Sequence, residues 1–239
     1  MICVAAIAPH GDVDTAPKLR AAMDELGRQF AACGCEAVVV VTPHNVHVEG
    51  HFAVVTAGHV GEHETDRALA SDLLYAIRAE GLPVVGVFYG GNDPAEAELP
   101  LDWGTEVPLE FVRAERVVVV APARDRPLDE HIRLGEAIVR GTGARRIGLV
   151  ASADHAHAHA ADGPYGFDPA AAAYDARFLE LLAAGTPDFR PLAELVDAAK
   201  ADSLWQLLVL QGAAPGPAKL LAYAAPTYYG MAVAVADVG

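Results

Sequence analysis

Histidines follow three of the apolar runs in this sequence at the points where the runs end. His10 stands in "APHGD", His44 stands in "TPHN", and His155, His157 and His159 alternate with other residues in "SADHAHAH". Imidazole binds iron(II), zinc, copper and nickel, and it titrates near neutral pH. Two such side chains with one carboxylate can hold an ion and leave positions open, while a further histidine moves protons.

The pattern therefore predicts His10 and His44 as metal ligands and one histidine of residues 155–159 as an acid/base. A solvated loop or an adventitious metal-binding tract is the alternative for the alternating histidines. The following segment "GPYGFDP" favours an ordered site, because it is rich in conformationally restricted residues. Its Tyr165 and Phe167 are suited to line a pocket for an aromatic molecule.

The elements that must position these residues alternate between strands and helices. Apolar, β-branched runs predict strands at 2–8, 36–43, 51–57, 83–90, 115–123, 145–152, 219–229 and 231–238. Helical spacing predicts helices over 15–33, 64–81, 127–141, 169–185, 191–200 and 202–212, the first with Thr15 as N-cap and Pro17 in its first turn. This order predicts an α/β fold: a single domain over residues 1–239 with a mostly parallel central sheet flanked by helices. Sites in such folds lie beyond the carboxyl ends of the strands, where His10, His44 and residues 155–159 are expected.

Composition excludes several classes of partner. The chain has 239 residues and a formal net charge of −15, which argues against nucleic acid and anionic membranes. No apolar run approaches the roughly 20 residues needed to span a bilayer, and the N-terminus is expected to be a core strand rather than a signal peptide.

The odd number of cysteines, three, favours a reducing cytoplasm. Cys33 and Cys35 in "CGC" suit either a soft metal site or, as we favour, a helix end at Gly34 with two small apolar fillers.

Five segments in order resemble the class III extradiol dioxygenase superfamily, the LigB-like group to which the Memo-type proteins are related. They are "APHG", "TPH", "LDWGTEVPL", "SADHAHAH" with "GPYGFDP", and "APTYYGMAVA". The resemblance spans nearly the whole chain. It implies iron(II), which another divalent metal such as Zn²⁺ replaces on purification in some cases, and a catechol-type diol and O₂ as the reacting partners. A homo-oligomer is the expected assembly.

Carried onto this chain, the resemblance implies His10 and His44 as metal ligands and His157 as the acid/base. A second set of residues is assigned to the substrate pocket: His155, His159, Tyr165, Trp103 and Tyr228.

Two departures from the family pattern matter. The family commonly has "DHGT" where this chain has Trp103 in "DWGT", so a proton-active group is replaced by a bulky ring. The family's third ligand is a glutamate near the C-terminus, and Ala224 occupies that position here. Asp12 is the replacement nearest in sequence, and Glu62, Glu64, Asp154 or water are further alternatives.

The sequence leaves three functions open. A ring-cleaving dioxygenase comes first, and a non-catalytic or metal-poor binding protein on the same scaffold comes second. A zinc hydrolase that uses the same histidines ranks third, because it depends on the histidines alone.

Overall fold

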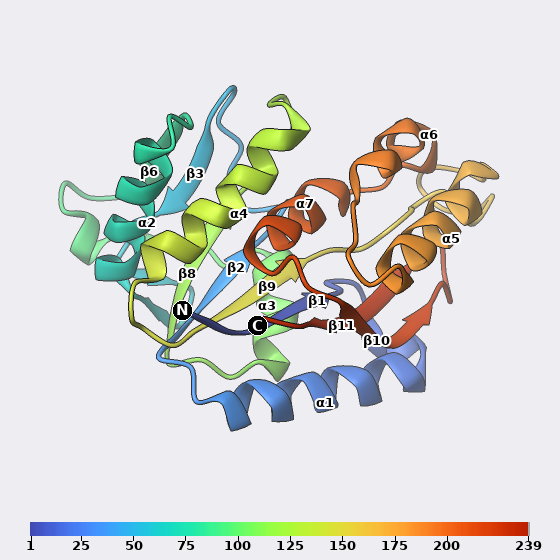
Figure 1. Cartoon of the computed structure of the whole chain (residues 1–239), viewed down its shortest axis with the longest axis horizontal. Coiled ribbons are helices and arrows are strands. Elements are labelled where there is room, and N and C mark those ends of the chain that lie inside the picture. Colours follow the sequence, from blue (N-terminus) through green and yellow to red (C-terminus); the bar gives the residue numbers. More distant parts are fainter. Residues whose placement is uncertain (239) are drawn as a thin grey trace.

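A mixed sheet runs through the centre of the molecule, and helices cover both of its faces (Figure 1). The computed structural model describes residues 1–238. Four strands form the parallel centre in the order β1 (Ile2–Ala8), β9 (Ile147–Ser152), β2 (Ala37–Val41) and β8 (Arg116–Ala121). The predicted α/β fold with a mostly parallel sheet is confirmed.

The central strands are continuous apolar runs because both of their faces are covered. All five residues of β2 are buried, as are the last five of β8. Strands buried on both faces lose the polar alternation of a solvated sheet. The remaining strands extend the two sides of the sheet: β11 (Met231–Ala236), β10 (Ala218–Ala224), β3 (Phe52–Val55), β6 (Val84–Val87), β5 (His63–Thr65), β4 (His59–Val60) and β7 (Glu98–Leu99).

Helices α1 (Pro17–Cys33) and α3 (Trp103–Phe111) pack on one face of the sheet. The other face carries α2 (Arg67–Ala79), α4 (Leu128–Thr142), α5 (Ala170–Ala183), α6 (Val196–Ala199) and α7 (Leu204–Ala213). Short 3₁₀ turns are η1 (Val13–Thr15), η2 (Pro94–Glu96) and η3 (Arg190–Glu194). Among the described residues, no helix is long and apolar enough to cross a bilayer.

The start of α1 differs from the prediction in one respect. Pro17 occupies the first turn as expected, but Thr15 is not the N-cap. The Thr15 hydroxyl donates to the Asp12 carbonyl at 2.6 Å, which closes η1, and Ala16 precedes the helix without a side-chain cap. The helix ends at Gly34, whose φ of 64° is the left-handed conformation that glycine adopts without strain.

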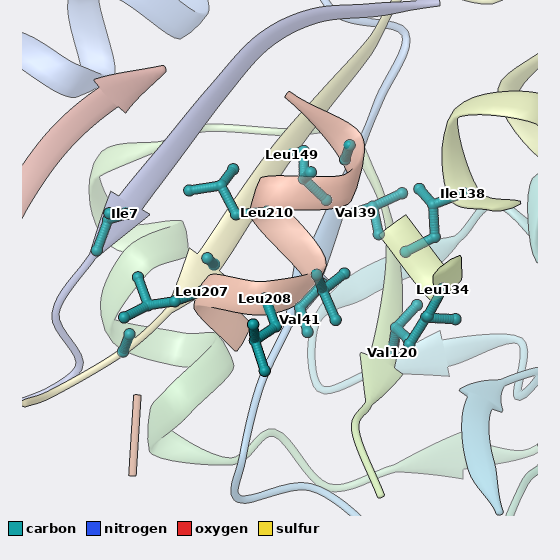
Figure 2. Close-up of a cluster of buried hydrophobic side chains, with 14 of the residues drawn as sticks. Ile7, Val39, Val41, Val120, Leu134, Ile138, Leu149, Leu207, Leu208 and Leu210 are labelled. Atoms are coloured by element: carbon teal, nitrogen blue, oxygen red, sulfur yellow. The ribbon is translucent and has the colours of Figure 1, made fainter. Parts of the chain in front are cut away.

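Helix α7 is apolar on nearly all sides and is buried against the sheet. Figure 2 shows Leu207, Leu208 and Leu210 of this helix among side chains of β2, β9 and α4. A helix that is apolar all round belongs in an interior. Two glycines let α7 approach α4 closely: a Cβ on Gly135 would lie 2.0 Å from the Val209 carbonyl oxygen, and one on Gly212 would lie 1.9 Å from that of Ile132.

Candidate metal centre

The order of the parallel strands brings His10 and His44 together. Strand β9 lies between β1 and β2, and His10 and His44 follow β1 and β2 at the same carboxyl edge. Their Nε2 atoms are 3.0 Å apart, and the two rings meet edge to face with centroids 4.7 Å apart. The two imidazoles therefore present their outer nitrogens to one point.

Asp202 supplies a carboxylate at the same point. Its Oδ2 lies 3.4 Å from His10 Nε2 and 3.3 Å from His44 Nε2. Its Oδ1 is buried and has no hydrogen-bond partner among the described residues. A buried carboxylate oxygen without a partner is costly, so it indicates a group that the protein is built to receive.

The spacing of the three donors fits a divalent ion. Protein nitrogen and oxygen ligands lie about 2.0–2.2 Å from such ions, so donors at right angles are about 3.0 Å apart and tetrahedral donors about 3.4 Å apart. The observed separations of 3.0, 3.3 and 3.4 Å fall in this range. Two histidines and one carboxylate on one side of an ion form the facial set that leaves positions open for other ligands.

Ser152 determines which nitrogen of His10 carries the lone pair. The Ser152 hydroxyl donates to the Gly104 carbonyl oxygen, which cannot donate in return. His10 Nδ1 lies 3.0 Å from Ser152 Oγ, so Nδ1–H is the donor in that contact. The lone pair of neutral His10 is therefore on Nε2, which faces His44 and Asp202, and the contact also fixes the ring orientation.

The buried carboxylates favour a positive charge at His10. Burial alone lowers the pKa of His10, but Asp154 and Asp202 outweigh that effect and raise the pKa to about 9. Burial raises the pKa of Asp202 as well, yet His10 and His44 together hold it below its usual range. Asp154 accepts from the His10 backbone N–H at 3.1 Å, and burial raises the pKa of its carboxyl. The metal-free centre therefore holds a proton where the bound form would hold an ion.

Asp102 fixes the loop that carries His44. One of its oxygens accepts from the Thr42 hydroxyl at 2.9 Å and from the Thr105 N–H at 3.1 Å. The other accepts from the Asn45 side chain at 2.9 Å and from the Thr105 hydroxyl at 2.8 Å. These four bonds join the start of α3 to the segment around His44, so "DWGT" has a structural role even without a histidine.

Contacts with the segment after β9 position Asp202. The His157 N–H donates to the Ala199 carbonyl at 2.9 Å, and His155 Nδ1 lies 3.1 Å from Ser203 Oγ. Ser203 directly precedes α7, so the positive end of that helix also favours the Asp202 carboxylate. These contacts, together with the close packing of α7 on α4, hold the third donor in place.

A cavity opens beside the three donors. It has a volume of about 270 Å³ and is lined by His10, Gly11, His44, Trp103, Asp154, His157, Tyr165, Tyr228 and Tyr229. A second cavity of about 300 Å³ shares His44, His157 and Tyr165 with the first and also contains Asp202. The lining combines several aromatic rings with a few ionisable groups, which is typical of a small-molecule site.

His157 lines this cavity, and its Nε2 has no hydrogen-bond partner among the described residues. Its Nδ1–H donates to the His155 carbonyl oxygen at 2.9 Å, which leaves the lone pair of the neutral ring on Nε2. The ring stacks on Tyr229 with centroids 5.8 Å apart and meets Tyr165 edge to face at 5.9 Å. These contacts fix the imidazole in the cavity lining as a potential proton acceptor.

Three of the residues assigned to the pocket line this cavity: Trp103, Tyr165 and Tyr228. The Trp103 ring lies over His44 with centroids 4.6 Å apart, at the position where the family commonly has a histidine. His155 and His159 lie elsewhere. His155 is buried against Phe178, with ring centroids 3.9 Å apart, and burial lowers its pKa to about 4. His159 Nε2 lies 2.7 Å from Asp175 Oδ2 and belongs to a separate hydrogen-bonded cluster.

The carboxylates considered as replacement ligands lie in different places. Asp12 is exposed and accepts from the Asp14 N–H at 3.0 Å, which caps η1. Glu64 lies on β5, where its backbone is in register with Arg116 at the start of β8, which is the amino edge of the sheet. Asp154 Oδ2 lies 3.6 Å from His10 Nε2, outside the three-donor group. Ala224 pairs with Met231 on β10 and β11, and Met231 in turn bridges to Asp154.

Asp202 itself was missed in the sequence. It is the first residue of the helix predicted over 202–212 and does not follow a strand, so the rule for strand ends did not point to it. The available signal was the following run "LWQLLVLQGA", since a helix with apolar residues on all sides must be buried. An aspartate next to the start of such a helix is buried with it, and a buried carboxylate needs a hydrogen-bond donor or a cation as partner.

Comparison with known proteins gives two findings. Residues 8–236 match the family model for the catalytic LigB subunit of aromatic ring-opening dioxygenase. Among solved structures, the chain is similar to the uncharacterized protein JW3007 from Escherichia coli K12, with 18% identity and a TM-score of 0.69. The match covers 98% of this chain and 100% of the other, and at this identity it shows a shared fold. No curated protein matches the sequence.

Proposed function

The chain belongs to the LigB family of aromatic ring-opening dioxygenase catalytic subunits, and from this premise we propose that it is a metal-dependent extradiol dioxygenase. Its substrate is a catechol-type aromatic diol, and its second substrate is O₂. His10, His44 and Asp202 hold the metal, which we expect to be iron(II). The whole chain, residues 1–239, acts as one domain of this type, in the cytoplasm and as a homo-oligomer.

The observation that carries this proposal is the convergence of two imidazoles and one carboxylate. Their donor atoms lie 3.0–3.4 Å apart, and the second oxygen of Asp202, the buried Oδ1, has no partner among the described residues. An iron(II) ion held by such a set supplies the redox chemistry that O₂ requires. A vacant third ligand was the main argument for a non-catalytic protein, and Asp202 weakens that argument.

His157 is the residue that we assign to proton transfer. Its Nε2 is free to accept, because Nδ1 is occupied by the His155 carbonyl. We propose that Nε2 removes a proton from a hydroxyl of the bound diol and later returns a proton during ring opening. The family resemblance implies the same role for His157, and the position of Nε2 supports it.

The aromatic side chains of the cavity orient the ring of the diol. Trp103 lies against His44 on one side, and Tyr165 and Tyr228 lie on the side of His157. The volume of about 270 Å³ is at the small end of ligand pockets, which favours a single-ring substrate.

The test is anaerobic reconstitution with iron(II), followed by exposure to a panel of catechols and O₂. We expect O₂ consumption with formation of a yellow ring-opened product. His157→Gln should lose about 10²–10⁴-fold in kcat and retain its iron, whereas His51→Gln, at an exposed histidine, should behave as wild type. Bound iron without turnover of any diol would favour the binding protein. Hydrolysis of esters or amides that needs zinc but not O₂ would favour the hydrolase.

A further inference from the structure

All three cysteines of the chain gather at one place, although they are far apart in sequence. Cys3 lies in β1, Cys33 ends α1, and Cys35 follows the left-handed Gly34 before β2. Cys3 Sγ lies 3.4 Å from Cys35 Sγ, and the three sulfur atoms all lie within 4.8 Å of one another. None of the three forms a disulfide, and each is only half-buried.

An irregularity in β1 turns Cys3 toward the other two. Ile2 pairs with Ile147 and Val4 pairs with Gly148, so Cys3 is an extra residue in the register with β9. In a regular strand, Cys3 and Val4 would point to opposite faces. Here both pack with the core on the α1 side of the sheet. A bulge of this kind re-aims a side chain at the expense of regular pairing, and its effect here is to complete the cluster.

The cluster is separate from the candidate metal centre. It lies at the amino ends of β1 and β2, whereas His10 and His44 follow their carboxyl ends. At about 3.3 Å per residue, the seven residues from Cys3 to His10 span roughly 20 Å. A positively charged side chain lies beside the cluster. The Arg146 guanidinium is 3.8 Å from Cys33 Sγ and also donates to the Cys33 carbonyl.

We propose that Cys3, Cys33 and Cys35 form a second metal site, a three-thiolate site for a thiophilic cation of the Zn²⁺ class. Zn–S bonds of about 2.3 Å place three sulfurs about 3.8–4.0 Å apart, so small rotations of the side chains suffice. Three thiolates and a divalent ion carry a net charge of −1, which the Arg146 guanidinium offsets. The half-exposed position leaves the fourth coordination place to water.

Binding releases protons in a defined number. Three thiols lose three protons to solvent as three metal–sulfur bonds form, and the oxidation state of metal and sulfur does not change. The Cys33 thiol gives up the proton that it otherwise donates to the Cys3 carbonyl at 3.0 Å. Burial raises the pKa of the Cys35 and Cys33 thiols, so binding weakens as the pH falls and protons compete with the cation.

The experiment uses the reduced, chelator-treated full chain under anaerobic conditions and Cd²⁺ as the probe. Cadmium bound to thiolates gives an ultraviolet charge-transfer band that histidine and carboxylate ligands do not give. We expect one equivalent of Cd²⁺ per chain to produce this band, Zn²⁺ to displace it, and the His10→Ala/His44→Ala variant to retain it. Cys3→Ser should lose about a third of the band and bind Cd²⁺ more weakly than the wild-type chain.

A second measurement covers the case in which Cys3→Ser fails to fold. One equivalent of Zn²⁺ should slow alkylation of all three cysteines in the wild-type chain, as read by mass spectrometry. Absence of the cadmium band in the reduced wild-type chain would overturn the proposal. Protection of only two cysteines, through a Cys3–Cys35 disulfide without metal, would overturn it as well. Failure of the ring-cleavage assay would leave these results unaffected, because the two sites share no residue.

Discussion

Replacement of Asp202 by asparagine tests the assignment of the third metal ligand directly. Asparagine has nearly the same size as aspartate, so α7 and its packing should be unchanged. The substitution removes the one negative charge that lies within 3.4 Å of both His10 Nε2 and His44 Nε2. We expect iron(II) or Zn²⁺ to bind much more weakly and ring cleavage to be lost with it.

The size of the effect follows from the burial of the group. Asp202 is 6% exposed, so its charge is poorly screened by solvent. Removal of one partner from a buried ionic contact costs about 3–5 kcal/mol. Because 1.36 kcal/mol is a factor of ten, the dissociation constant should rise by roughly 10²-fold or more.

The assay is anaerobic competition for the metal between the protein and a chelating dye. Asp12→Asn is the matched control, because Asp12 is exposed, caps η1 and was the replacement ligand nearest in sequence. Asp154→Asn should have a smaller effect, since its carboxylate lies 3.6 Å from His10 Nε2 and outside the three-donor group. The assignment of Asp202 is refuted if Asp202→Asn binds metal as tightly as wild type. Loss of metal binding in Asp12→Asn alone would identify Asp12 as the third ligand instead.

Further predictions concern pH dependence and helix packing. In the metal-free protein, the pKa of His10 rises from 6.5 to about 9, which contributes about 3 kcal/mol of stability below pH 6.5 that is lost as the pH rises through 9. Urea unfolding should show this loss, and saturation with metal should abolish it. His155, with its pKa lowered from 6.5 to about 4, should cost about 3 kcal/mol of stability as the pH falls from 6.5 to 4, with or without metal. Gly212→Ala should destabilise the protein by about 1–3 kcal/mol, because the added methyl group meets the Ile132 carbonyl oxygen. Helix propensity alone would make this variant more stable by up to about 1 kcal/mol, so a rise in its melting temperature would contradict the packing argument.

The architecture could be predicted because it depends on local patterns. The apolar runs of β2 and β8 and the spacing of Leu19, Met23, Leu26 and Phe30 in α1 report burial directly. Helix α3 was not predicted, since its nine residues include Pro108 and follow an irregular segment. Its cap depends on Asp102, whose four hydrogen bonds reach three different residues and leave no periodic signal.

The site could be predicted only in part, for a reason of topology. The rule for parallel sheets brought His10 and His44 to one edge, but the sequence could not show that β9 lies between their strands. The residue pattern also could not show which of the three alternating histidines after β9 lines the cavity. Each has its own surroundings: His155 is buried on Phe178, His157 lines the cavity, and His159 contacts Asp175. In a regular strand, residues at every second position would share one face. The segment after β9 is not a regular strand and bends at His157, so the three rings reach different surroundings.

The position of Asp202 suggests how a family site can change its ligand without losing its geometry. The expected glutamate position, Ala224, lies on β10, which pairs with β11 at the side of the sheet beyond β1. Asp202 instead reaches the two histidines from the segment just before α7, on the face of the sheet that carries α2, α4, α5, α6 and α7. The carboxylate oxygen needs only to lie about 3 Å from the two imidazole nitrogens, and that requirement does not specify which element supplies it. The contacts that fix Asp202 are those of α7 with α4 and with the segment after β9. Variants such as Gly212→Ala that loosen this packing should therefore weaken metal binding as well as stability, even though they lie outside the centre.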